Sequence, residues 1–162
     1  MNGVVDFRSL GMEIGTANIQ LKQNASDNPL FYNTPHNIKA HVVHSQSVIR
    51  LPEHSVILAD NSFEPHHAFM LNNHIWGVQF HPEFNEEIMK SIINIYSEEL
   101  TAEGVDVANV INSICYTPYG SIILENKNTY GILKTSNPTV LSSNVLGILS
   151  LIILKYYQAS AV

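Results

Sequence analysis

The chain has 162 residues, of which 45% are hydrophobic and 14% are charged, and this length is enough to bury one hydrophobic core. The formal net charge is −6 and the sequence contains no basic run, which argues against a general nucleic-acid-binding surface. A single cysteine, Cys115, excludes an internal disulfide framework and is typical of a reducing compartment, so we expect a cytoplasmic protein.

Strand patterns dominate the first eighty or so residues. Segments rich in β-branched and aromatic residues alternate with polar turn segments, and the Asn72-Asn73 pair is a plausible tight turn between two of them. We expect strands at residues 13–21, 39–44, 55–59, 68–71 and 75–80.

The hydrophobic period changes to that of a helix after residue 84. Asn85 is a suitable N-cap for a helix over residues 85–100, which has acidic residues in its first turn, and Gly104 can end this helix. A second apolar stripe, capped by Asp106, predicts a helix that includes Cys115. The succession of short strands resembles the strand-rich end of an α/β domain, and we therefore expect an α/β fold.

Residues 145–154 form a strongly apolar run near the C-terminus. The run is ten residues long, well short of the ~20 residues that span a bilayer. We therefore expect a core or interface helix there, and no membrane anchor.

A histidine and a carboxylate stand two residues apart at the end of the expected 75–80 strand. In an extended chain, residues i and i+2 leave the backbone on the same side, so the side chains of His81 and Glu83 can meet. Pro82 fixes its own φ and biases His81 toward the extended region. A carboxylate beside an imidazole can hold one ring nitrogen protonated and leave the other free to take a proton from a nucleophile. The pattern predicts two members of a catalytic triad, although the bare tripeptide would also suit a strand end that runs into a turn.

The sequence around this pair extends the match. Residues 76–83, W-G-V-Q-F-H-P-E, closely resemble the signature that closes the active site of class I glutamine amidotransferases of the GMP synthase-like type. Residues 13–16, 28–31, 48–52 and 68–69 also resemble that family in order and spacing. The resemblance implies a partial flavodoxin-like mixed sheet with flanking helices, glutamine as substrate, no cofactor, and a Cys-His-Glu triad that uses His81 and Glu83.

The resemblance begins just downstream of the family's Gly-x-Cys-x-Gly elbow, which carries the nucleophile. We therefore expect residues 1–104 to be the C-terminal half of an amidotransferase domain, and residues 105–162 to be a helical extension of unclear role. Such a chain would hydrolyse glutamine only with a complementary N-terminal half, and a synthase subunit would receive the ammonia. The alternative is a truncated, non-catalytic remnant that acts at most as a binding module.

Three further residues are candidates for the chemistry. Cys115 lacks flanking glycines and lies on a predicted apolar helix face, so we interpret it as a buried structural thiol and not as the nucleophile. The family resemblance implies that the backbone of Ser45 and Gln46 contacts bound glutamine, although Gln46 stands where the family usually has an acid. A plain loop between two strands is the alternative for Ser45 and Gln46.

The eight histidines raise the possibility of a metal site. His41 and His44 are three residues apart, which places them on opposite faces of a strand. His66 and His67 are adjacent, with Glu64 nearby, but the sequence contains no HExxH or CxxC pattern. On these spacings we expect no metal.

Overall fold

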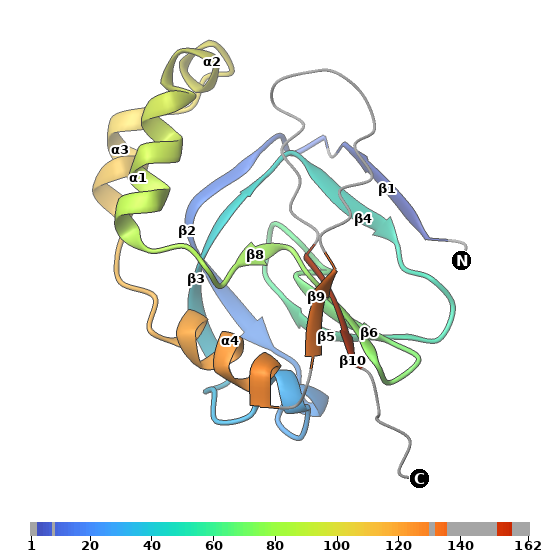
Figure 1. Cartoon of the computed structure of the whole chain (residues 1–162). Helices are drawn as coiled ribbons and strands as arrows, with labels where there is room; N and C mark the ends of the chain where they lie inside the picture. The colour runs from blue at the N-terminus through green and yellow to red at the C-terminus, as the bar shows by residue number, and fades with distance from the viewer. Residues whose placement is uncertain (1–2, 8, 130–131, 136–151, 157–162) are drawn as a thin grey trace, which may run out of the picture.

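The computed structural model describes residues 3–7, 9–129, 132–135 and 152–156. Its strands are β1 (Val4–Phe7), β2 (Glu13–Leu21), β3 (Asn37–His44), β4 (Gln46–Arg50), β5 (Ser55–Asp60), β6 (Ala68–Leu71), β7 (Ile75–Val78), β8 (Phe80–His81), β9 (Ile132–Thr135) and β10 (Ile152–Tyr156). Its helices are α1 (Glu86–Ile95), α2 (Ser97–Ala102), α3 (Val107–Ser113) and α4 (Tyr119–Thr129), with short 3-10 turns η1 (Gln23–Ala25) and η2 (Pro29–Phe31). Helices α1, α2 and α3 lie together beside the sheet, and α4 packs separately against β3 and η2 (Figure 1). The predicted α/β class with flanking helices is confirmed.

The strands form one large sheet and one small one. The large sheet has the order β8-β3-β2-β5-β6-β7-β10-β9, and β1 pairs with β4 in the small sheet. Each strand pair among the described residues is antiparallel. The strands expected at 13–21, 39–44, 55–59 and 68–71 are confirmed as β2, β3, β5 and β6, whereas β1 and β4 were not predicted.

The strand expected at residues 75–80 is divided at Gln79 into β7 and β8. β7 pairs with β6, whereas β8 pairs with β3, and these partners lie far apart in the strand order. Because one residue separates β7 from β8, the six strands from β8 to β7 must curve until their two ends meet at Gln79. The curvature brings the His81 end of this segment onto β3.

The alternating residues of β3 face two different cores. Ala40 and Val42 belong to the larger core, which α4 closes with Ile123. Val43 belongs to a second core with Met89 and other residues of α1, α2 and α3. Because side chains alternate along a strand, odd-numbered β3 residues face the α1–α3 layer and even-numbered residues face the larger core.

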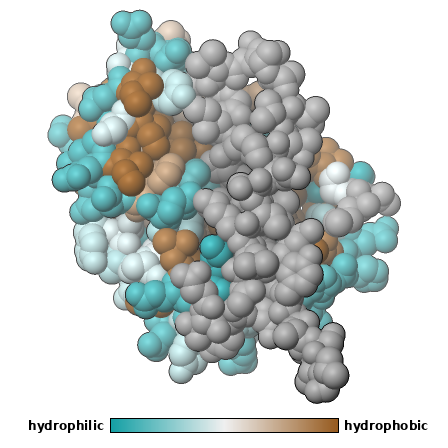
Figure 2. Space-filling view, viewed as in Figure 1, coloured by the Kyte–Doolittle hydropathy of each residue, from teal (hydrophilic) through white to brown (hydrophobic). Residues whose placement is uncertain are grey.

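The helix expected at 85–100 is two helices. Asn85 caps α1 as predicted, since its Oδ1 accepts a hydrogen bond from the backbone N–H of Ile88 at 2.9 Å. The helix stops at Tyr96 and resumes as α2, after which Gly104 adopts a φ of +83°. Apolar residues gather over the α1 region on the face seen in Figure 2. Ile88 and Ile95 of α1 are exposed.

The prediction that Cys115 lies on a helix was wrong. Asp106 caps α3 as expected, with Oδ1 accepting from the backbone N–H of Asn109, but α3 ends at Ser113. Ile114 is already extended, and Cys115 is half-buried between α3 and α4. The helical spacing of apolar residues runs past the end of α3, because Ile114 is buried although its backbone is extended.

Part of the apolar run 145–154 also differs from the prediction. Residues 152–154 lie in strand β10, which pairs with β7 and β9, and not in a helix. Residues 145–151 lie outside the described residues. Within the described part of the chain, no helix has the length and apolar character needed to cross a membrane. The boundary at residue 104 stays a prediction.

A buried asparagine joins the turn at η2 to the β6–β7 hairpin. Asn28 Oδ1 accepts hydrogen bonds from the backbone N–H of Leu30 at 3.1 Å and from the indole Nε1 of Trp76 at 2.9 Å. Its Nδ2 lies 3.3 Å from the sulfur of Met70. Trp76 and Asn28 are both buried, so this side chain satisfies the indole N–H inside the core.

We predict that Asn28→Ala lowers the free energy of unfolding by about 1–3 kcal/mol, because it removes the acceptor of the buried indole N–H of Trp76. Urea unfolding followed by the fluorescence of Trp76, the one tryptophan of the chain, measures the change. The control is Asn24→Ala, since Asn24 is exposed on η1. Equal midpoints for the two variants would contradict the assignment.

Candidate functional site

The predicted pair His81 and Glu83 is brought together at the end of β8. Nδ1 of His81 lies 3.1 Å from Oε1 of Glu83, which is hydrogen-bond distance. His81 is 7% exposed, and Glu83 is half-buried. With Glu83 ionised and Nδ1 protonated, Nε2 is the unprotonated nitrogen of a neutral His81 ring.

Phe84 packs against the flat face of the His81 ring. The two rings are stacked, with a centroid distance of 4.0 Å and an interplanar angle of 5°. The turn is closed by a hydrogen bond from the backbone N–H of Phe84 to the carbonyl of His81 at 3.2 Å. Sequence reasoning missed Phe84, although its position three residues after His81 in a proline-containing turn is a usable signal.

A second histidine stands directly beside the first. His41 of β3 is the register partner of His81, and its Nδ1 lies 3.2 Å from Oγ1 of Thr16 on β2. Burial lowers the pKa of His41 below its ordinary value of 6.5, and the charge of His81 acts in the same direction, whereas Glu86 raises it. His41 therefore favours the neutral form next to His81.

Cys115 lies on the same side of the sheet as His41. Its backbone N–H donates to Oγ1 of Thr16 at 3.3 Å, and Nζ of Lys39 donates to its Sγ at 3.5 Å. The buried helical position that we expected for this thiol is therefore wrong. What still distinguishes Cys115 from a nucleophile elbow is the absence of flanking glycines and of a strand-to-helix turn.

Ser45 and Gln46 are not brought to His81. They follow β3 at its far end, four and five residues beyond His41, and four extended residues span about 13 Å. Ser45 forms the bend, but Gln46 begins strand β4 and pairs with Phe7, so the loop expected at 45–47 is confined to Ser45. The carbonyl of Gln46 lies 3.0 Å from Nδ1 of His44.

A second grouping of histidines and a carboxylate was missed by sequence reasoning. Oε2 of Glu13 lies 2.9 Å from Nε2 of His44 and 3.2 Å from Nε2 of His67. Burial by itself raises the pKa of Glu13, but its contacts with His44, His67 and Asn61 outweigh burial and bring the pKa to about 2. The strand pairing of Glu13 with His44 was the signal that the spacing along the chain did not contain.

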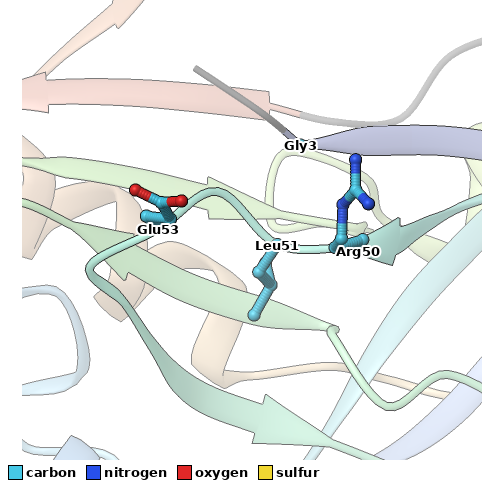
Figure 3. A pocket seen from close by; sticks show the side chains of 4 residues that line it. All are labelled: Gly3, Arg50, Leu51 and Glu53. Carbon is cyan, nitrogen blue, oxygen red and sulfur yellow. The ribbon is translucent and has the colours of Figure 1, made fainter.

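A pocket lies next to the small sheet. Figure 3 shows its lining residues, Gly3, Arg50, Leu51 and Glu53, of which the last three come from the end of β4 and the segment after it. None of the candidate site residues lines this pocket. It is therefore separate from the His81–Glu83 pair.

Comparison with known families identifies the chain. The model of the family described as glutamine amidotransferase class-I matches residues 4–94, which is more than half of the chain. The chain belongs to the class-I glutamine amidotransferase family. The predicted resemblance is thereby confirmed.

Curated relatives match the same part of the chain. The glutamine-hydrolysing GMP synthase of Christiangramia forsetii is 39% identical over 72 residues, which are 44% of this chain and 14% of the relative. The same enzyme of Thermosipho africanus is 31% identical over 98 residues, 57% of this chain and 18% of the relative. Gamma-glutamyl peptidase 5 of Arabidopsis thaliana is 29% identical over 94 residues, 57% of this chain and 38% of the relative. The chain thus spans well under half the length of each of these relatives.

Solved structures agree with the fold. A glutamine amidotransferase from Thermotoga maritima superposes with a TM-score of 0.59 at 21% identity, over 77% of this chain and 51% of that one. A glutamine amidotransferase from Methylobacillus flagellatus gives a TM-score of 0.52 at 19% identity, over 60% of this chain and 38% of that one. At this identity the likeness concerns the fold alone.

We predict that His41→Gln makes the free energy of unfolding depend less steeply on pH below about 6.5. The folded state holds the pKa of His41 below the unfolded value of about 6.5, so the unfolded state binds more protons there. Stability from neutral His41 is fully present above pH ~6.5 and is lost as the pH falls from that value toward the lower folded pKa. Urea unfolding of both proteins between pH 7.5 and 5 measures the slopes, which should differ by at most about 1.4 kcal/mol per pH unit. Parallel curves would refute this account of His41.

Proposed function

We propose that this chain supplies the general base and its orienting carboxylate for hydrolysis of the glutamine side-chain amide. The observation that carries the proposal is the 3.1 Å contact between Nδ1 of His81 and Oε1 of Glu83 at the end of β8. Membership of the class-I glutamine amidotransferase family and the two glutamine-hydrolysing GMP synthases among the relatives support this chemistry.

The proposed roles follow from the ring orientation. Glu83 accepts the Nδ1 proton of His81, and Phe84 stacks on the ring, so Nε2 is held as the proton acceptor. Nε2 takes the proton of a cysteine thiol as the sulfur attacks the amide carbon, and returns it to the departing ammonia. Water then attacks the resulting thioester while Nε2 accepts its proton, which releases glutamate and the thiol.

The nucleophile in this scheme comes from outside the 162 residues, because they contain no Gly-x-Cys-x-Gly sequence. A complementary segment of the same or another polypeptide would carry it, and a synthase subunit would receive the ammonia. The backbone of Ser45 and Gln46 is proposed to contact glutamine in that assembled site. The proposed base and its orienting carboxylate lie within residues 4–94, the part of the chain that the family matches.

A chimera tests the roles of His81 and Glu83. Residues 4–94 replace the matching segment of an active class I glutamine amidotransferase, and ammonia release from glutamine is followed. His81→Ala should lower kcat by more than the roughly 10²–10⁴ ascribed to proton transfer alone, because triad members act as a unit. Glu83→Gln should cost less, since a neutral amide oxygen can still accept the Nδ1 proton.

The matched control in the chimera is His74→Ala, because His74 is exposed in the β6–β7 turn. Its activity should equal that of the parent chimera. Near-parental activity of His81→Ala would overturn the assignment of the base. A parent chimera that folds but releases no ammonia would favour the non-catalytic binding module.

The 162-residue chain by itself should release no ammonia from glutamine. It would have a base but neither an elbow nucleophile nor the adjacent oxyanion donors, and each such donor contributes roughly 10²–10³ in rate. The assay compares the wild type with Cys115→Ser, since Cys115 carries the one thiol of the chain. Clear turnover that disappears in Cys115→Ser would show that this thiol, beside Lys39 and Thr16, is the nucleophile.

A further inference from the structure

We propose that Glu13, His44 and His67 form a binding site for a divalent transition-metal ion of the Zn²⁺ type. Their potential ligand atoms all lie within 4.8 Å of one another. Two imidazoles and a carboxylate are a ligand set that Zn²⁺ uses in proteins. We expected no metal from the spacing along the chain, which did not include Glu13.

The distances suit a common ion. Glu13 Oε2 is 2.9 Å from Nε2 of His44 and 3.2 Å from Nε2 of His67. Ligands about 2.0–2.2 Å from a tetrahedral zinc lie roughly 3.3–3.5 Å from one another. A shift of the Glu13 carboxylate by roughly 0.1–0.6 Å would bring both of its separations from the imidazole nitrogens into this range.

The hydrogen-bonding roles of the two ring nitrogens of His44 also favour a cation beside Nε2. Nδ1 of His44 faces the carbonyl of Gln46 at 3.0 Å, and a carbonyl only accepts, so Nδ1 carries the proton. A neutral ring would then place Nε2, an acceptor, against a carboxylate acceptor at 2.9 Å, so a proton or a metal ion must lie between the two atoms. A metal ion there would bond to both atoms, and the Nδ1–H to carbonyl contact is the orienting bond usual for a metal-binding histidine.

The surroundings hold the ligands in place. Asn61 Nδ2 donates to the other carboxylate oxygen of Glu13 at 2.7 Å. The rings of His44 and His67 meet edge to face at 5.9 Å, and the ring of Phe63 lies 6.3 Å from His44. His67 is fully buried, and its Nδ1 has no hydrogen-bond partner among the described residues.

The site is separate from the proposed base. His44 is an even-numbered residue of β3, whereas His41, the register partner of His81, is odd-numbered, so the two groups lie on opposite faces of that strand. The side chain of Glu13 is 12% exposed, while those of His44 and His67 are 3% and 0% exposed. The carboxylate therefore lies on the side from which an ion and a fourth ligand, such as water, would enter.

Metal binding is measured on the 162-residue chain after removal of metal with a chelator. Zn²⁺ is titrated in competition with a chromogenic chelator, and Co²⁺ is titrated while its visible absorption is recorded. We expect one equivalent of either ion per chain and the intense absorption of tetrahedral or five-coordinate Co²⁺. No stoichiometric binding, or a six-coordinate Co²⁺ spectrum of water ligands, would overturn the proposal.

Variants locate the ion. Glu13→Gln and His67→Gln should each weaken Zn²⁺ binding at least 100-fold, and Asn61→Ala, which keeps all three ligands, should weaken it about 10–100-fold. The matched control is His66→Gln, because Nδ1 of His66 faces the carbonyl of Val48 and not the cluster. Cys115→Ser is a second control, and the two control variants should bind Zn²⁺ as tightly as the wild type does.

Trp76 fluorescence checks that each variant folds. If a ligand variant does not fold, the Zn²⁺ affinity of Asn61→Ala tests the site in its place. Unchanged affinity in Asn61→Ala and in a folded ligand variant would contradict the site.

Discussion

The segment from Ile75 to His81 joins the two ends of one curved run of strands. It helps to position both the His81–Glu83 pair and the cluster that contains His67. β7 pairs with β6 at one end, and β8 pairs with β3 at the other. Gln79 joins them, and its backbone N–H donates to the carbonyl of His67 at 2.8 Å. One short stretch therefore presents His81 beside His41 and at the same time ties down His67.

Two imidazole–carboxylate groupings lie on opposite faces of β3, and their geometries suit different chemistry. Nδ1 of His81 contacts the carboxylate of Glu83, and in the proposed function Nε2 of the same ring transfers the proton. Glu13 instead has two imidazole nitrogens near a single oxygen, an arrangement in which a proton or a metal ion must supply positive charge. The first is local in sequence, while the second is assembled from three strands or strand ends.

The limits of sequence reasoning follow the same division. His81, Glu83 and the Asn85 cap were predictable because their contacts join residues two or three positions apart. The Glu13 cluster was not, since strand register brings together residues 31 positions apart. Cys115 was placed on a helix because the apolar period runs through Ile114, yet that residue is buried from an extended backbone. Gln46 was assigned to a loop because its pairing with β1 is equally invisible along the chain.

The central claim is that Glu83 keeps the proton of neutral His81 on Nδ1, so that Nε2 is the unprotonated nitrogen. Nitrogen-15 NMR of the histidine side chains in the 162-residue chain measures this tautomer, with Glu83→Ala assigning the signal and testing its cause. The account predicts the Nδ1–H form in the wild type and loss of that preference in Glu83→Ala. An Nε2–H form of His81 in the wild type would contradict it, because the nitrogen that must accept the proton would already hold one.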